Sequence, residues 1–554
     1  MKFKKAASIA LAGAMAMSMM AVPAFADTAT KYSVTIDQNT SDTGVHTYAA
    51  YQIFAGTLSS SSTSVLSDVT WGSGVDQTKL TDSVKADIAK ALGITSEEAG
   101  DAAKVANALS GKVDKGTEAE SFAEAINGAL GTAENSETGE GDLTIDGLTG
   151  GYYLIKDNSD PTGEYASQTR YLLKVLQNEK ISVKSSVPTV EKKVTDINDT
   201  TAATATGDSA DYDIGDTVPF TLTATLGDGI KNFKQYYLKF TDTMSAGLTY
   251  TARSAVVTVD YDGDLSTTDD EVTLTEYDFT AGTATTLTGA DGTTSEEATP
   301  YTLTIDNLFT ATGVAKENLK SGSKVVVTYN ATLNDKAKIG AAGNPNEVTL
   351  TYSSNPNYEG DGTKTPTNET PKDRNVVFTY KLDTTKYLGS TDGAKSTEAE
   401  FTLKKEIKNA DGTLALQDVT LTKDETKKLY SAEGIDDGTY ILTETKAPDG
   451  YNLITDSVEY NGKTYANSVE ITLDAKHSNG DSPALTELSS KVGSSEAVAG
   501  TLSTGVVTAS IVDKAGNELP STGGIGTKIF YEAGIAMIAA AGIILVLKKR
   551  KENA

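Results

Sequence analysis

The pattern of apolar and polar positions divides the chain into a mixed first part and a longer part made of short alternating runs. In the first part, residues 80–110 and 119–130 carry apolar side chains three and four positions apart, with few β-branched interruptions, which favours helix. Short strands are predicted at residues 31–37 and 152–155, near the two ends of this part. We therefore expect an α+β domain at residues 27–185, with a sheet formed by its ends.

From residue 188 onward, Thr, Val, Tyr and Gly dominate short runs of alternating apolar and polar residues, with turn residues between them. Regularly spaced strands of this kind are typical of immunoglobulin-like β-sandwiches. A polar, Pro-bearing stretch at residues 355–372 separates two such regions. We expect a mainly β protein in which one sandwich spans residues 186–360, a linker spans 361–374 and a second sandwich spans 375–516.

The N-terminus has the features of an export signal. Lysines at positions 2, 4 and 5 precede an apolar stretch at residues 6–22. Ala24 and Ala26 then supply the small side chains that a signal peptidase inspects. We expect a signal peptide at residues 1–26 and a mature chain that begins near Asp27.

The C-terminus combines three features in a fixed order within residues 519–554. A Pro-containing motif comes first, an apolar run at residues 533–547 follows, and basic residues at 548–551 close the run. The apolar run predicts a membrane span, and the basic residues prefer the cytoplasmic side, so the motif is left exposed outside the cell. The motif consists of Leu519, Pro520, Ser521, Thr522 and Gly523.

This arrangement resembles the LPxTG sorting signals that are read by the sortases of Gram-positive bacteria. The resemblance implies that a sortase cysteine attacks the carbonyl carbon of Thr522, releases Gly523 and passes the acyl group to an amine. It therefore implies an exported protein that ends covalently attached to the cell surface. An ordinary single-span anchor that stays uncut is the alternative.

Composition narrows the possible functions. The 554 residues include no Cys and only two His, at positions 46 and 477, and carry a net charge of −28. This acidity argues against a nucleic acid or an anionic membrane as partner. A His/Cys metal site or a histidine-based catalytic triad has almost nothing to be built from, so we expect no enzyme, no cofactor and no metal. The acidic loop at residues 260–270 has a Ca²⁺-tolerant composition, but a solvated acidic turn explains it better.

Alternation along strands predicts which polar side chains lie inside the sandwiches, because successive residues of a strand point to opposite faces. Six polar residues share the parity of apolar neighbours in their own strands, and they fall into two sets that each contain one lysine, one acid and one residue with a side-chain carbonyl. The sets are Lys192, Asp242 and Asn346 in the first sandwich, and Lys386, Glu444 and Asp513 in the second. We expect each set to meet in one core.

Burial gives these sets a chemistry. A buried lysine loses its proton and becomes a nucleophilic amine, while a buried carboxylic acid keeps its proton and polarises a nearby carbonyl. Attack of Lys192 on the side-chain carbonyl of Asn346 would form an isopeptide bond and release ammonia, and attack of Lys386 on Asp513 would release water. Asp242 and Glu444 would be the acids. A buried salt bridge, or a lysine that extends outward along the sheet, is the alternative for each set.

With these residues identified, the chain resembles the sortase-assembled backbone (major) pilins of Gram-positive bacteria. Residues 440–451 are similar to the E-box of collagen-adhesin B-type (CNA-B) domains, with Glu444 in the place of the acid. Residues 241–250 and 343–346 are similar to the acid-bearing and Asn-bearing segments of the family. Asp513 stands where these pilins usually have Asn, so the bond there would join Lys to Asp or be absent.

The resemblance also implies a pilin motif, in which an exposed lysine between the first two domains accepts the acyl group of the next subunit. The usual Tyr-Pro-Lys-Asn is missing, and residues 181–188 stand in its place. Lys184 has the parity opposite to the apolar residues beside it, so we expect it to face solvent and act as the nucleophile. Lys180 is the alternative, and Lys193 is a weaker one.

The first region resembles an N-terminal pilin domain at residues 46–54 and 71–75. Residues 151–157 are similar to an E-box, but Lys156 occupies the position where Glu would be needed. We expect no internal isopeptide bond in this domain.

The resemblance implies the major structural subunit of a pilus that supports adhesion. A pilus-specific (class C) sortase would join Thr522 of one copy to Lys184 of another, and a housekeeping sortase would attach the base to peptidoglycan. Tip or minor pilins and host surface ligands are further expected partners. The alternative is a singly wall-anchored adhesin or minor pilin whose first region binds a host glycan or matrix protein. A glycosidase is a remote third possibility, because acids are abundant and no carboxylate pair stands in a recognisable cleft context.

Overall fold

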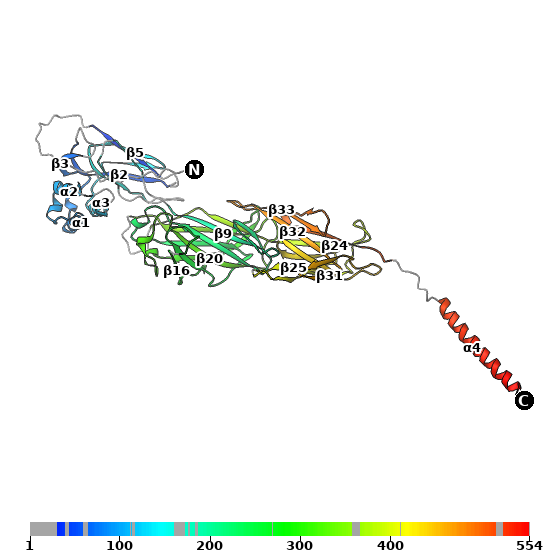
Figure 1. The fold of residues 1–554 in the computed structure, drawn as a ribbon. Coiled ribbons are helices and arrows are strands. Elements are labelled where there is room, and N and C mark those ends of the chain that lie inside the picture. The colour runs from blue at the N-terminus through cyan, green and yellow to red at the C-terminus, as the bar shows by residue number, and fades with distance from the viewer. Residues whose placement is uncertain are drawn as a thin grey trace.

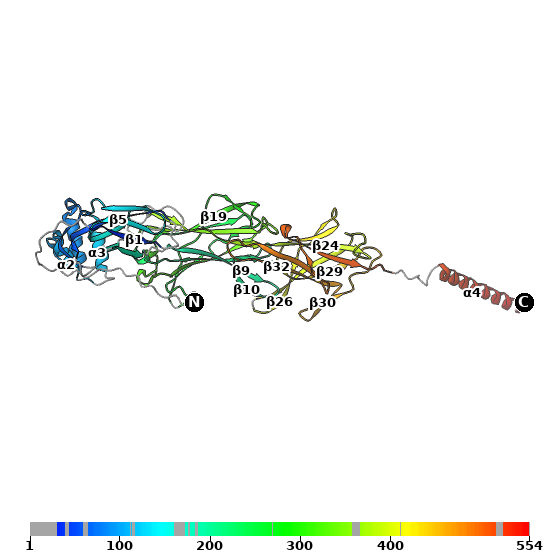
Figure 2. The ribbon, with the colours of Figure 1, turned by 90° about the horizontal axis from the view of Figure 1, so that it is seen from above.

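A computed structural model describes residues 30–38, 44–58, 65–110, 112, 117–159, 172–175, 178–182, 187–268, 270–356, 366–409, 411–516 and 525–552. Figures 1 and 2 show an elongated molecule. An α+β region forms one end, two β-sandwiches follow each other along the long axis, and the C-terminal helix α4 (Ile525–Glu552) lies apart from them. The expected fold class, mainly β with tandem sandwiches after an α+β region, is confirmed.

The first region consists of three layers. One sheet has the strand order β3-β2-β6-β7, with β4 paired to β2, and helices α1 to α3 cover one of its faces through a core that includes Phe54 and Phe122. The other face packs on a sheet of order β5-β1-β8 through Val34, Tyr48 and Ile155. The elements are β1 Tyr32–Asp37, β2 His46–Leu58, β3 Leu66–Trp71, η1 Gln77–Lys79, α1 Asp82–Leu92, η2 Glu98–Gly100, α2 Ala102–Ser110, α3 Thr117–Asn127, β4 Asn135–Gly139, β5 Leu143–Leu148, β6 Gly151–Asp157, β7 Leu172–Val175 and β8 Glu179–Ser182.

Two expectations for this region need correction. The strands at its two ends, β1 and β6, do not share a sheet, because each pairs with other strands and their two sheets pack face to face. The helical stretch expected at residues 80–110 is broken, because Gly93 ends α1 in a left-handed conformation with φ 72°. The chain then passes through a short 3₁₀ turn before α2 begins.

The middle region is a sandwich of two mainly antiparallel sheets. One has the order β10-β9-β12-β20-β15-β16, with β14 paired to β20; the other has the order β11-β23-β21-β13-β19-β17, with β18 on β19 and β22 on β21. The strands are β9 Thr189–Asn198, β10 Ala203–Gly207, β11 Ser209–Asp211, β12 Thr217–Thr225, β13 Leu238–Ser245, β14 Leu248–Tyr250, β15 Val256–Asp260, β16 Glu271–Leu274, β17 Thr280–Ala281, β18 Thr285–Thr288, β19 Ser295–Ile305, β20 Lys324–Leu333, β21 Asn344–Ser353, β22 Thr367–Glu369 and β23 Asp373–Phe378, with 3₁₀ turns at Ile230–Asn232, Leu308–Thr310 and Lys316–Asn318.

The last region is a second sandwich, with sheets of order β27-β28-β24-β35 and β26-β25-β29-β32-β33-β34 and a hairpin of β30 and β31. Its first and last strands, β24 and β35, are parallel neighbours. The elements are β24 Tyr380–Leu388, β25 Glu400–Lys408, β26 Leu414–Val419, β27 Thr422–Asp424, β28 Leu429–Ile435, β29 Gly438–Lys446, β30 Ser457–Tyr460, β31 Lys463–Ala466, β32 Ser468–His477, β33 Leu485–Val492, β34 Val498–Ala499, η6 Leu502–Thr504 and β35 Val506–Asp513.

The chain passes from one sandwich to the next within one extended segment. Strand β23, which ends at Phe378, pairs with β21 and β11 of the middle sandwich. Strand β24, which begins two residues later at Tyr380, pairs with β28 and β35 of the last one. The expected start of the second sandwich, residue 375, falls inside β23, so residues 375–378 lie in the middle sandwich and the last sandwich begins at Tyr380. This leaves little free chain between the two bodies.

Candidate functional site

The middle sandwich encloses a polar centre around Lys192, which is 0% exposed. Lys192 lies on β9 of one sheet, whereas Asp242 on β13 and Asn346 on β21 lie on the other, and both are also 0% exposed. The ammonium nitrogen of Lys192 contacts Asp242 Oδ2. Strand alternation directs Lys192 into the core and thus brings all three predicted residues into one centre between the sheets.

Burial controls the charge state of this centre. Removal from water lowers the pKa of Lys192 and raises that of Asp242, although each group partly offsets the shift of the other. The rings of Phe220 and Tyr329 lie 4.9 and 5.3 Å from Lys192 Nζ and exclude water from it. Asp242 Oδ1 and Asn346 Oδ1 are buried without a hydrogen-bond partner among the described residues. The lowered pKa of Lys192 and the raised pKa of Asp242 both favour a neutral amine beside a neutral acid.

Sequence reasoning missed a fourth member of this centre, Tyr329 of β20. Its hydroxyl oxygen lies 2.8 Å from Lys192 Nζ, 2.8 Å from Asp242 Oδ2 and 2.8 Å from Asn346 Nδ2. Its ring stacks on Phe220, with centroids 5.3 Å apart. Alternation along β20 does place Tyr329 inside, but an inward tyrosine looks like an ordinary core residue in a sequence.

The last sandwich encloses the second predicted set. Lys386 lies on β24, and its Nζ contacts Asp513 of the adjacent strand β35 and lies 2.8 Å from Glu444 Oε1 of the opposite sheet. All three side chains are 0% exposed. Burial raises the pKa of Glu444, despite opposing contributions from Lys386 and the Ile454 amide, which donates to Glu444 Oε2 at 2.8 Å. A neutral Glu444 would leave one lysine and one reactive carboxyl in the core.

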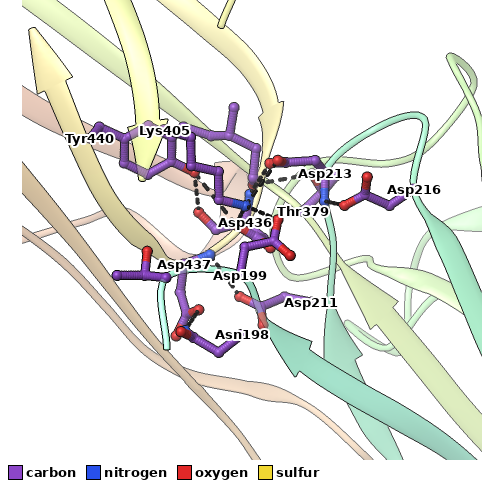
Figure 3. Close-up of polar contacts among 12 residues, drawn as sticks. Asn198, Asp199, Asp211, Asp213, Asp216, Thr379, Lys405, Asp436, Asp437 and Tyr440 are labelled. Carbon is purple, nitrogen blue, oxygen red and sulfur yellow. Dashed lines mark hydrogen bonds and ion pairs between the residues drawn. The ribbon is translucent and has the colours of Figure 1, made fainter. Parts of the chain in front are cut away.

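A third buried lysine, Lys405 of β25, was also missed (Figure 3). Its Nζ contacts Asp436 of its own sandwich and lies 2.7 Å from Asp199 Oδ2 and 2.9 Å from Asp213 Oδ2 of the middle one. Burial opposes the charge of Lys405, but the three carboxylates outweigh it and raise the pKa of the amine. Lys405 therefore stays charged, in contrast to Lys192, whose pKa is lowered. We call the contact between the two sandwiches around Lys405, Asp199, Asp213 and Asp436 the joint.

Several predicted residues lie outside the described part of the chain. They are Ala24, Ala26, Lys184 and the motif residues Leu519, Pro520, Ser521, Thr522 and Gly523. The two other candidate pilin-motif lysines are described, and both are paired with acids. Lys180 Nζ lies 3.0 Å from Asp37 Oδ1, and Lys193 Nζ lies 2.7 Å from Asp208 Oδ1.

The described part of the first region has no comparable centre. Its buried polar residues are Gln38, His46, Gln52 and Asp157, and none of them is a lysine. Lys156 donates from Nζ to Asn127 Oδ1 at 3.1 Å. The carboxylates of Asp260, Asp262 and Asp270 lie close enough to share a cation, and so do two groups at the joint between the sandwiches. Lys405 itself neutralises one of those groups, and we assign a metal to none of the three.

Comparison with known families supports the reading of both the C-terminus and the last sandwich. The family described as the LPXTG cell wall anchor motif matches residues 511–553, and the prealbumin-like fold domain of the SpaA type matches residues 382–476. In the described chain, the segment Ile529–Lys551 is long and apolar enough to cross a membrane, with a mean hydropathy of 2.1. The chain is an exported, cell-wall-anchored surface protein. Its anchor makes it a sortase substrate.

Individual relatives of this surface protein extend the comparison. It is 27% identical over 431 residues to the trypsin-resistant surface T6 protein of Streptococcus pyogenes serotype M6, covering 66% of this chain and 70% of the relative. The solved T6 backbone pilin of the same organism aligns with 88% of this chain and 99% of its own, at 17% identity and a TM-score of 0.46. The major pilin SpaD of Corynebacterium diphtheriae aligns with 88% and 98%, at 13% identity and a TM-score of 0.41. The anchor motif, the SpaA-type domain and the similarity to the T6 surface protein agree with the expected resemblance to sortase-assembled backbone pilins.

Proposed function

We propose that this protein is the repeating structural subunit of a covalently joined surface pilus. The observation that carries the proposal is the presence of two buried lysine centres, one in each consecutive sandwich, in a chain that ends in an LPXTG anchor. Homology to the T6 protein, which is a backbone pilin, supports the same role. The role is structural, and the chain is the substrate of an enzyme rather than an enzyme itself.

Each centre supports an internal isopeptide bond. In the middle sandwich, neutral Lys192 attacks the side-chain carbonyl carbon of Asn346, and ammonia leaves. In the last sandwich, Lys386 attacks the carboxyl carbon of Asp513, and water leaves. Fixed contact inside a core raises the effective concentration of the reacting groups to roughly 10⁵ M or more in favourable cases, so no external catalyst is needed.

The positions of these bonds suit a fibre under tension. The Lys386–Asp513 bond joins the first and last strands of its sandwich, and the Lys192–Asn346 bond joins the first strand of its sandwich to the facing sheet. A pulling force then passes through covalent bonds instead of through the hydrogen bonds of a sheet. This provides the durability that exported proteins often obtain from disulfides, which a chain without Cys cannot form.

Polymerisation requires a lysine that is free to attack an acyl-sortase intermediate. We assign this role to Lys184, with Thr522 of the next copy as acyl donor and a class C pilus sortase as the enzyme. The electrostatics of the other candidates support this choice. The hydrogen bond that Lys180 donates to Asp37 raises the pKa of Lys180. Burial opposes the charge of Lys193, but Asp208 and Glu191 outweigh it and raise the pKa of Lys193 as well. Both amines are thereby held protonated, which makes them poorer nucleophiles.

The test is assembly in a pilin-free Gram-positive host that expresses the chain together with a pilus sortase. Denaturing gels of cell-wall extracts should show a regular ladder of high-mass species. Lys184→Ala should abolish the ladder, whereas the matched variant Lys180→Ala should retain it. A single wall-linked species from the unmodified chain would favour the alternative, an adhesin or minor pilin that is anchored singly and binds a host glycan or matrix protein.

A further inference from the structure

The hydroxyl group of Tyr329 touches all three predicted members of the Lys192 centre. Lys192 Nζ donates to Tyr329 Oη at 2.8 Å, and so does Asn346 Nδ2 at 2.8 Å. The hydroxyl in turn donates to Asp242 Oδ2 at 2.8 Å. Tyr329 is 2% exposed, so its proton exchanges with these partners rather than with bulk water. It therefore lies between the nitrogen that must lose a proton and the nitrogen that must gain one.

Amide nitrogen is a poor leaving group until it is protonated, so release of ammonia from Asn346 requires an acid at Nδ2. Asp242 is the buried acid of the centre, yet the hydrogen bond that Asn346 Nδ2 donates goes to Tyr329 Oη. Asp242 Oδ2 lies on the other side of that hydroxyl. The two 2.8 Å contacts of the hydroxyl therefore offer a proton a path from Asp242 to the leaving nitrogen through Tyr329.

We propose that Tyr329 is a catalytic proton relay for the Lys192–Asn346 bond, an inference that rests on the isopeptide chemistry proposed above. The bond between Lys192 Nζ and Asn346 Cγ forms, and the bond between Cγ and Nδ2 breaks. Tyr329 gives its hydroxyl proton to the departing nitrogen and recovers one from Lys192, directly or through Asp242. One proton moves from the lysine nitrogen to ammonia, and Tyr329 and Asp242 end unchanged.

The last sandwich provides an internal comparison. Within its described residues, Lys386 contacts only the two carboxyl groups among polar side chains, and the ring nearest to its Nζ is that of Phe401, at 5.4 Å. The group that leaves there is the hydroxyl of a carboxylic acid, and Glu444 is already 2.8 Å from Lys386. The Lys386 centre therefore needs no separate relay. The relay belongs to the Lys192 centre, where the leaving group is ammonia.

The experiment compares the whole chain and its Tyr329→Phe variant during cell-free synthesis. Samples are quenched in denaturant at intervals, and the cross-linked fraction is measured by mass spectrometry of the Lys192 and Asn346 peptides. Loss of a positioned proton donor typically slows a reaction by about 10²- to 10⁴-fold, so we expect slowing of at least roughly 100-fold. Tyr236→Phe is the matched control, because it makes the same change at a buried tyrosine of the same sandwich outside the centre.

A second variant separates proton transfer from packing. Site-specific replacement of Tyr329 by a fluorinated tyrosine keeps the ring and the hydroxyl but makes the phenol more acidic. We expect this change to alter the rate of bond formation several-fold and to shift its pH profile. A merely structural role would leave both unchanged.

The outcomes distinguish the relay from the function on which it rests. If the unmodified chain forms no Lys192–Asn346 bond, both the relay and the proposed chemistry of this centre are overturned. If the unmodified chain forms the bond and both Tyr329 variants form it at the same rate, the relay alone is overturned. The Lys386–Asp513 bond of the same molecules reports whether the last sandwich has folded, and the Tyr236→Phe chain controls for the loss of a buried hydroxyl in the middle sandwich.

Discussion

Lys405 and Asp213 belong to different sandwiches, yet Lys405 Nζ lies 2.9 Å from Asp213 Oδ2 inside a shared interface. Asp213 also accepts a hydrogen bond from the Asp436 amide at 2.8 Å, so one aspartate engages both a side chain and the backbone of its neighbour. Figure 3 shows Lys405 surrounded by the carboxylates of Asp199 and Asp213 from the middle sandwich and of Asp436 from its own sandwich. The two sandwiches are thereby held as one body, which suits a subunit that transmits force along a shaft.

Replacement of Lys405 by Met should destabilise this joint, because it leaves several carboxylates buried beside one another without a cation. Loss of one partner of a buried ion pair typically costs about 3–5 kcal/mol. Calorimetric unfolding of the purified chain should show a lower transition temperature and separate transitions for the two sandwiches. Lys404→Met is the matched control: Lys404 is the preceding residue of β25 and pairs with Asp418, which is 84% exposed, so its loss should change little. Equal effects of the two variants would contradict the joint.

Stability of the joint should fall as pH rises through the neutral range. Burial, reinforced by Asp211, raises the pKa of Asp437 to about 7 and that of Asp196 to about 6. Because both values lie above those of the unfolded chain, the folded state holds these protons more tightly, and stability is lost between about pH 4 and pH 7. Burial opposes protonation of His477, but Asp211 and Asp196 outweigh it and raise its pKa, so its contribution is also lost as pH rises. Thermal melts should give a higher Tm at pH 5 than at pH 8.

The variant Asp437→Asn tests the source of that pH dependence. Asn keeps an oxygen that can accept the hydrogen bond from Asn198 Nδ2, which measures 2.6 Å, but it carries no charge at any pH. The variant should therefore be more stable than the unmodified chain at pH 8 and show a flatter Tm profile. An unchanged slope between pH 5 and pH 8 would show that Asp437 does not contribute.

Removal of the second cross-link should weaken the last sandwich strongly. Lys386→Ala removes a bond between positions 127 residues apart, and closing a loop of that length is worth about 5 kcal/mol. The variant should unfold at a lower temperature and be cut faster by trypsin. Lys381→Ala on the same strand removes ion pairs with Asp383 and with the exposed Glu433 but no cross-link, and it should behave much like the unmodified chain. A trypsin-resistant Lys386→Ala chain would argue that the bond is absent or mechanically unimportant.

Alternation correctly predicted that the side chains of Lys192 and Lys386 are buried, because a strand with one buried face fixes the direction of every side chain along it. The same rule places Tyr329 inside but could not reveal that it belongs to the Lys192 centre, because an inward tyrosine looks like an ordinary core residue. Alternation along β25 does put Lys405 on the buried face with Leu403, but it could not reveal the partners of Lys405, because Asp199 and Asp213 lie in a different sandwich about 200 positions earlier in the chain. Periodicity found the helices of the first region but not the break at Gly93 or the division of β1 and β6 between two sheets, which depends on long-range pairing.

The most direct test of the account is the intact mass of the whole chain purified from a host that lacks sortases. Mass spectrometry after denaturation measures every internal condensation, and cross-linked peptides then identify the residues joined. The account predicts a mass lower than that of the processed sequence by one ammonia and one water, with links at Lys192–Asn346 and Lys386–Asp513. An unshifted mass would contradict internal cross-linking and leave a wall-anchored surface protein whose buried lysines form only salt bridges.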